Sequence, residues 1–116
     1  MKLKNNQQKT FNLIEVEDKS ENKDITALGE VKFNAEISED KAKFVTNVNV
    51  SELSGEFNMQ LLNENGEAVS EFGCRPSDFT QNEDQDYENE FNIVYTEGYG
   101  LDDVTSVYIE YLDFQG

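Results

Sequence analysis

The side chains with the clearest chemical potential are carboxylates gathered between Asn82 and Glu90. Four of them occupy alternate positions, so in an extended strand they would share one face at a spacing of about 6.6 Å: Asp84, Asp86, Glu88 and Glu90. Like charges in such a row repel one another, and no neighbour in the sequence offsets them. One explanation is a solvated strand edge, because charged side chains discourage an exposed edge from pairing with another chain.

A calcium site is the second explanation of this stretch. Calcium takes about six to eight hard oxygen ligands, which carboxylates and neighbouring asparagine amides could supply. The stretch lacks the glycine and the terminal glutamate of an EF-hand loop, so this hypothesis rests on composition without the expected spacing. Apart from calcium, no cofactor is expected. The candidate ligands are Asp84, Asp86 and Glu88.

Mimicry of a nucleic-acid backbone is the third explanation. Phosphates on one DNA strand lie about 3.4 Å apart along the axis, and carboxylates on neighbouring strands can imitate their field. Further carboxylates could extend the row: Glu64, Glu67, Glu71, Glu97, Asp102, Asp103, Glu110 and Asp113. The residues that we predict to contact a partner are Glu83, Asp84, Asp86, Glu88, Glu90, Asp102, Asp103 and Tyr99.

The cysteine and the tyrosines give weaker indications of function than the carboxylates. Cys74 precedes Arg75, and a neighbouring cation lowers the pKa of a thiol. With no histidine and no second cysteine in the chain, we expect a loop thiol or a small buried hydrophobe instead. Four tyrosines surround the final turn and strand, where they either form a recognition patch or close one end of the core: Tyr95, Tyr99, Tyr108 and Tyr111.

The formal charge of −16, from 25 acids against 9 bases, excludes several classes of partner. Residues 44–116 hold sixteen of the acids and a single cation, Arg75, because all eight lysines lie at or before Lys43. Such a surface repels nucleic-acid phosphates and anionic lipid headgroups, so neither is expected as a direct ligand. The absence of histidine removes histidine-based catalysis, and nothing singles out a catalytic pair of carboxylates. We therefore expect no enzyme.

Short segments with apolar residues at alternate positions must position these groups. The clearest is 30–38, where alternation is typical of a strand with one buried face. Asn65-Gly66 suits a short hairpin turn, and 99–106 has room for a single helical turn. Seven strands are predicted in all: 10–17, 30–38, 42–50, 57–61, 67–73, 87–96 and 105–114.

Seven short strands in a domain of this size predict a single antiparallel β-sandwich of immunoglobulin-like type. A small barrel is the alternative, and parallel α/β folds are excluded because no connection contains a crossover helix. We expect residues 1–9 to form a disordered tail and residues 10–116 to form the domain. No apolar stretch follows the start, so the sequence shows neither a signal peptide nor a membrane span, and removal of a signal peptide before Met1 stays open as an alternative.

Two segments carry a resemblance to a known family. One is the hairpin around Leu62-Asn63-Glu64-Asn65-Gly66-Glu67, and the other is the closing segment Leu101-Asp102-Asp103-Val104-Thr105-Ser106-Val107-Tyr108-Ile109. Together they resemble immunoglobulin-like accessory domains of Gram-positive bacterial cell-envelope proteins and lipoproteins. The resemblance implies a non-catalytic module outside the cytoplasm, secreted or in the envelope, that binds a protein. The alternatives are a cytoplasmic acidic inhibitor of a DNA- or RNA-processing protein and a calcium-stabilised adhesion-type module. The partner could be a basic protein, and the sequence leaves the oligomeric state open.

Overall fold

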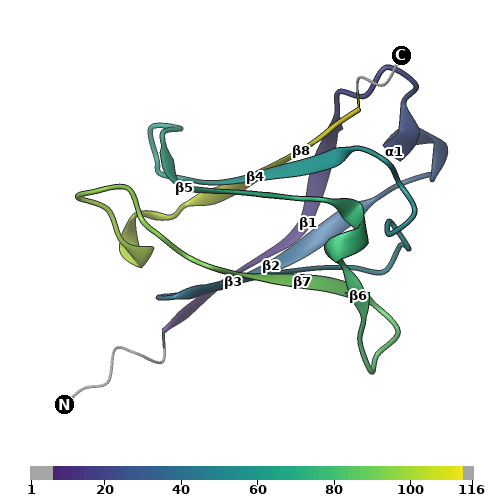
Figure 1. Ribbon diagram of the computed structural model, residues 1–116. Helices are drawn as coiled ribbons and strands as arrows, with labels where there is room; N and C mark the ends of the chain where they lie inside the picture. The colour runs from purple at the N-terminus through teal and green to yellow at the C-terminus, as the bar shows by residue number, and fades with distance from the viewer. Residues whose placement is uncertain (1–6, 114–116) are drawn as a thin grey trace.

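The structure of the protein is a computed structural model that describes residues 7–113. It is all-β, with three short helical segments between the strands (Figure 1). The helical segments are α1 (Asp24–Ala27), η2 (Pro76–Asp78) and η3 (Leu101–Asp103). The eight strands are β1 (Gln8–Asp18), β2 (Lys32–Ser38), β3 (Lys41–Thr46), β4 (Glu56–Leu62), β5 (Ala68–Cys74), β6 (Thr80–Gln81), β7 (Tyr87–Asn92) and β8 (Ser106–Leu112).

All eight strands belong to one sheet in the order β5-β4-β8-β1-β2-β3-β7-β6. β1 pairs antiparallel with β2 from Gln8↔Ser38 to Glu15↔Lys32, and its last three residues pair parallel with β8 from Val16↔Ile109 to Asp18↔Tyr111. A bulge between Phe11 and Ile14, with Leu13 at a φ of 58°, interrupts the pairing of β1 with β2. Bulges bend a strand and increase its twist, and the sheet curls here into an open half-barrel whose two layers face each other (Figure 1).

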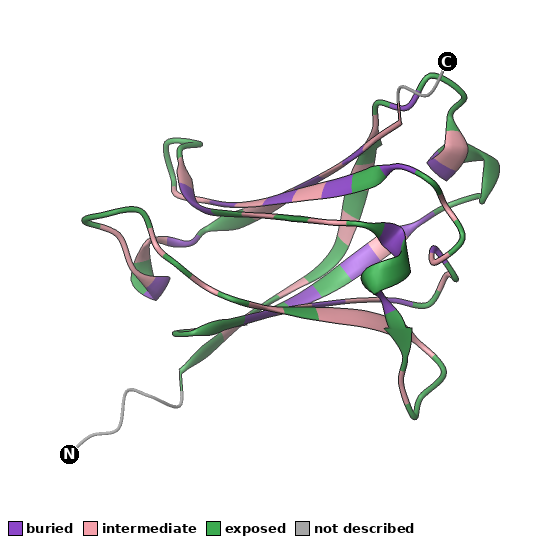
Figure 2. Cartoon of the chain, viewed as in Figure 1, coloured by how far each residue is buried: buried purple, intermediate pink, exposed green. Residues whose placement is uncertain are grey.

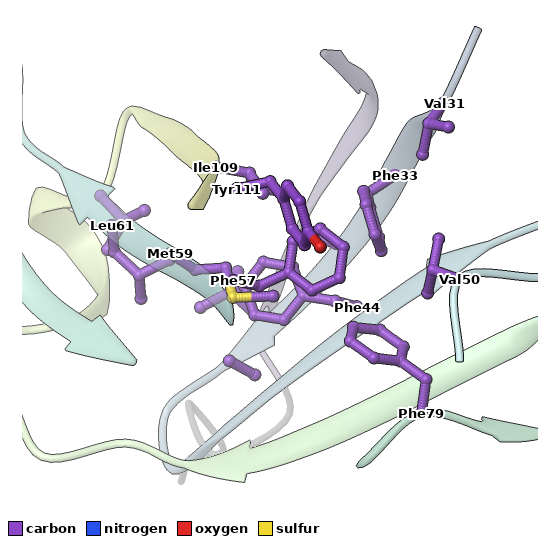
Figure 3. Close-up of a cluster of buried hydrophobic side chains, with 14 of the residues drawn as sticks. Val31, Phe33, Phe44, Val50, Phe57, Met59, Leu61, Phe79, Ile109 and Tyr111 are labelled. Carbon is purple, nitrogen blue, oxygen red and sulfur yellow. The ribbon is translucent and has the colours of Figure 1, made fainter. Parts of the chain in front are cut away.

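The core lies between these two layers. Apolar side chains at alternate positions of β2, β3, β4 and β8 are fully buried, as the alternation of burial along β4 illustrates (Figure 2). The rings of Phe33 and Phe57 meet across the layers with centroids 5.6 Å apart, and Phe57 also packs against Tyr111 on the neighbouring strand of its own layer, with centroids 5.2 Å apart (Figure 3). Edge-to-face and tilted pairs of this kind add to the free energy gained by burial.

The segment after β7 covers part of the edge of β5. The Thr96 amide donates to the Val69 carbonyl over 2.8 Å, and the Ser70 hydroxyl donates to the Val94 carbonyl over 2.9 Å. These bonds tie the end of one layer to the outermost strand of the other.

The predicted all-β class is confirmed, and each of the seven predicted strands overlaps a strand of the structure. The predicted helical turn within 99–106 is confirmed as η3. The strand β6 was not predicted, since its two residues are too few to show alternation. The helix α1 was not predicted either; it has only four residues and is held by a side chain from β1. The Asp18 carboxylate accepts hydrogen bonds from the backbone and hydroxyl of Thr26, both over 2.9 Å.

Three details of the predicted architecture differ. The sheet is mixed rather than purely antiparallel, because β1 and β8 run parallel. An immunoglobulin-like sandwich of seven strands is not confirmed, since β2 and β3 form a hairpin within one layer. Gln8 and Lys9 belong to β1 rather than to a disordered tail, because they pair with Ser38 and Ile37, while residues 1–6 of the predicted tail lie outside the described part. Across residues 7–113, no helix has the length and apolar character needed to cross a membrane.

Candidate functional site

The acidic stretch between Asn82 and Glu90 forms a hairpin turn, not one extended row. The Asn82 side-chain oxygen accepts hydrogen bonds from the amides of Asp84 (2.9 Å) and Asp86 (3.0 Å). Gln85 takes a φ of 69°, and β7 starts only at Tyr87. The prediction that all four carboxylates share one strand face is therefore wrong, because asparagine stabilises a turn through its own side chain.

The carboxylates of this stretch that lie on β7 have polar and cationic neighbours that the sequence did not indicate. Glu90 lies opposite Lys43 on β3, and Glu36 on β2 lies on the other side of the same lysine. The Lys43 ammonium is 3.7 Å from the Glu36 carboxylate. Glu88 accepts a hydrogen bond from the Asn82 amide group over 2.9 Å. One cation of β3, Lys43, thus lies between a carboxylate of β2 and one of β7, which the order of residues along the chain does not reveal.

The calcium hypothesis gains no support from this geometry. In the described part of the chain, no three side chains of the acidic or cysteine type are grouped so that they could hold a metal ion. Asp84 lies in the turn, whereas Glu88 lies on the strand and is bound by Asn82.

The other predicted residues meet at a different place, where the β4–β5 turn lies beside the loop before β8. We call this place the acidic end and define it by Glu64, Glu67, Tyr99, Asp102 and Asp103. They surround a hollow of about 390 Å³ together with Asn63, Asn65 and Thr105. Among the described residues, no lysine or arginine lines this hollow.

Backbone and side-chain hydrogen bonds fix the acidic end. The Asn63 side-chain oxygen accepts from the amides of Asn65 and Glu67, each over 2.9 Å, and Gly66 takes the φ of 81° that the turn requires. The Thr105 amide donates to the Leu62 carbonyl over 2.8 Å, which holds the loop against the turn.

Tyr99 links the two segments of the acidic end. Its hydroxyl donates to the Glu67 carboxylate over 3.2 Å. The negative charge of Glu67 and this hydrogen bond raise the pKa of Tyr99, so the phenol stays protonated at neutral pH. In the loop, the Asp103 carboxylate accepts from the Gly100 amide over 2.8 Å at the start of η3.

The predicted partner residues thus divide into two groups. Figure 1 shows the β6–β7 turn, with Glu83, Asp84 and Asp86, on the opposite side of the molecule from the loop that carries Asp102. The carboxylates proposed to extend the mimicking row also diverge, since Glu71 and Glu110 lie on the outer face of β5 and β8. A single row of charges along neighbouring strands is not formed.

The tyrosines and the cysteine take separate places. Tyr111 is fully buried, Tyr95 and Tyr99 pack against the core, and Tyr108 faces outward, so the four do not form one patch. Cys74 is the last residue of β5 rather than part of a loop, and it is half-buried against the core. Burial raises its pKa to about 12.

A hollow that the sequence did not predict lies on the outer face of β4, β5 and β8. We call it the outer groove; it measures about 670 Å³. Strand register places two rows of residues across it, Glu110–Asn58–Gly73 and Tyr108–Gln60–Glu71, and Lys19 borders it beyond the end of β1.

A hydrogen-bond network organises one side of the outer groove around Glu110, whose side chain is 19% exposed. Its carboxylate lies 3.0 Å from the Lys19 ammonium and accepts from the Tyr108 hydroxyl over 3.1 Å and from the Asn58 amide group over 3.3 Å. Burial alone would raise the pKa of Glu110, but these hydrogen bonds outweigh it and lower the pKa. Burial and Glu110 raise the pKa of Tyr108, so at neutral pH the carboxylate is charged and the phenol is a donor.

The signal for the outer groove was present in the sequence but not specific. Polar residues alternate with apolar ones at 56–61 and again at 106–111, which places Asn58, Gln60 and Glu110 on solvent-facing sides. Only the pairing of β4 with both β5 and β8 brings them together.

Comparisons with known proteins add no relative to this description, since no family model, curated protein or solved structure matches the chain.

Proposed function

We propose that the protein is a non-enzymatic binding module that recognises a basic protein surface through the acidic end. The observation that carries the proposal is the convergence of four carboxylates and one tyrosine from two separate segments around a single hollow. Their geometry is set before any partner binds, because Asn63, Thr105 and Tyr99 hold the turn and the loop together. Preorganised surfaces lose less entropy on binding.

Charge and shape favour a cationic protein as the partner. Clustered carboxylates create a negative potential that accelerates the encounter with a positively charged surface. Tyr99 adds a large side chain with few rotatable bonds to the lining of the hollow, and tyrosine is among the residue types that most often dominate binding energy. Glu64 and Asp102 are exposed and form no side-chain hydrogen bond within residues 7–113, so both are free to pair with lysine or arginine.

The test compares two double variants with the same change in charge. Glu64→Gln/Asp102→Asn neutralises the acidic end, and Glu83→Gln/Asp84→Asn neutralises the β6–β7 turn on the opposite side. Each protein is immobilised and exposed to an extract of the native host, and bound proteins are eluted with rising salt. We expect a captured basic protein that the first variant loses and the second retains. Screening shortens the Debye length from about 10 Å at 0.1 M to about 3 Å at 1 M, so elution should depend on salt.

Two outcomes would contradict the proposal. Equal capture by both variants would show that the acidic end is not the binding surface, and elution that does not depend on salt would remove the electrostatic argument. A captured nucleic-acid-binding protein that free DNA displaces would favour the mimicking inhibitor instead. Retention of that protein in the presence of DNA would keep the acidic end as a site for protein binding alone.

We also propose that the protein is related to immunoglobulin-like accessory domains of the bacterial envelope. Its support is a β fold of two facing layers around one core, with the first strand shared between the layers. The β2–β3 hairpin departs from the immunoglobulin arrangement, in which the second and third strands lie in different sheets. Fractionation of the native host, with an antibody against the folded domain, tests the extracytoplasmic setting: detection only in the cytoplasmic fraction would refute it.

A further inference from the structure

The outer groove lies on a different surface from the acidic end, and its chemistry is different. We propose that the outer groove binds a neutral oligosaccharide. The groove lies across three strands of a sheet rather than in a mobile loop, so its side chains are held by strand register. Its volume of about 670 Å³ falls within the range of roughly 300–1,000 Å³ that is usual for small-molecule sites.

The hollow is open at one point because a residue on this face of the sheet is a glycine, which has no side chain. Gly73 lies beside Asn58 in the first row, where every other strand position carries a side chain. A Cβ atom at Gly73 would lie 3.3 Å from the Asn58 side-chain oxygen and would narrow the groove at this point. Any larger side chain would occupy the space next to the amide.

The polar groups of the groove are arranged to offer hydrogen bonds to a ligand. The amide nitrogens of Asn58 and Gln60 donate to Glu110 and Glu71, over 3.3 Å and 2.9 Å. Both amide oxygens therefore point away from these carboxylates, and within residues 7–113 neither accepts another hydrogen bond. The Lys19 side chain is 48% exposed, and its ammonium group retains protons beyond those given to its partners.

This combination selects a ligand rich in hydroxyl groups. Hydroxyls both donate and accept, so they can satisfy amide and carboxylate oxygens and the ammonium within one ligand. Two glutamates against one lysine disfavour an anion, and the polar walls disfavour an apolar molecule. Tyr108 supplies the one aromatic ring that faces outward in the groove, against which a sugar ring can pack. With a single aromatic platform, we expect a dissociation constant on the order of 1 mM.

The experiment is a titration of the isotope-labelled protein with neutral hexasaccharides, followed by nuclear magnetic resonance. The probes are cellohexaose, maltohexaose, mannohexaose and chitohexaose, each up to about 10 mM. We expect at least one of them to shift the Gly73 amide and the side-chain amide signals of Asn58 and Gln60. Gln60→Ala and Tyr108→Ala should each weaken binding about tenfold, whereas Gln81→Ala, an exposed glutamine outside the groove, should leave it unchanged.

The result remains decisive if a groove variant fails to fold, because the shifted signals of the unaltered protein locate the site. No shift with any of the four saccharides would overturn the proposal, as would shifts confined to residues outside the groove. A neutral serine- and glycine-rich hexapeptide provides a further arm, and groove shifts with this peptide but with no saccharide would also overturn it. The Glu64→Gln/Asp102→Asn variant should bind saccharide normally, so this proposal can fail or succeed independently of the acidic end.

Discussion

Replacement of Gly55 by alanine should destabilise the fold strongly, because the space beside its Cα is already filled. A Cβ atom at Gly55 would overlap the Leu112 carbonyl oxygen of β8 and would lie 2.7 Å from both the hydroxyl and the adjoining ring carbon of Tyr111. Neither neighbour can move freely, because β8 is paired with β4 at this level and the Tyr111 ring is fully buried against Phe57.

The expected magnitude has two parts. The Gly55 amide donates to the Tyr111 hydroxyl over 2.8 Å in a buried position, and loss of such a bond costs about 1–3 kcal/mol. Forcing a methyl group into a packed core costs about 1–3 kcal/mol more. We therefore expect the free energy of unfolding to fall by about 4 kcal/mol and the Tm to fall by roughly 15 °C. Tyr111→Phe, which keeps the ring, removes this bond together with the longer bond from the hydroxyl to the Asp24 carboxylate, over 3.5 Å, and should cost about 1.5 kcal/mol.

The matched control is Gly100→Ala. Gly100 has an extended backbone at a φ of −153°, and no atom lies within 4 Å of its Cβ position. This substitution should be neutral or stabilise by about 0.5 kcal/mol, because it restricts the unfolded chain. Urea unfolding followed by circular dichroism and tyrosine fluorescence measures all three variants. Stabilities of Gly55→Ala and Gly100→Ala within about 1 kcal/mol of each other would refute the packing described around Tyr111.

The remaining predictions concern titratable groups. Burial alone would raise the pKa of Asp18, but the hydrogen bonds to its carboxylate hold this pKa below 3.8. Asp18→Asn should therefore lower the free energy of unfolding by about 1 kcal/mol at pH 7. This loss should vanish as the pH falls below 3.8, which urea unfolding at several pH values checks. Desolvation, and after it the neighbouring Asp113, raise the pKa of Asp24 in the folded protein. The charged carboxylate therefore destabilises the fold as the pH rises through this pKa, so Asp24→Asn should raise the Tm at pH 7 and leave it unchanged below pH 3.8. A lower Tm of the variant at pH 7 would contradict this. With a pKa raised by burial to about 12, the Cys74 thiol should react with iodoacetamide at pH 8 roughly a thousandfold more slowly in the native protein than in urea; mass spectrometry measures the rates, and a difference below about tenfold would refute it.

The strands could be predicted because their signal is local. The alternation of Val31, Phe33, Ala35 and Ile37 places these residues on one face whatever the strand pairs with, and all four are buried. The Asn65-Gly66 turn was predictable for the same reason, since the conformation it requires depends on the residues within it.

The candidate sites were less predictable because they depend on which segments become neighbours. Asp102 and Glu64 are 38 positions apart in the sequence, and their meeting at the acidic end follows from the pairing of β4 with β8. The apparent row from Asp84 to Glu90 failed because the Asn82 side chain competes with the strand for backbone amides.

The sequence by itself determined that the protein is an acidic all-β chain, because composition and the two-residue period of a strand are properties of neighbouring residues. The tertiary structure decided that β1 pairs with strands of both layers, that the carboxylates divide between two sides of the molecule, and that Gly73 opens a groove beside Asn58. The physical reason is that burial of the shared core fixes the pairing of strands that are distant in the sequence. This pairing brings together polar side chains whose proximity cannot be read from neighbouring residues.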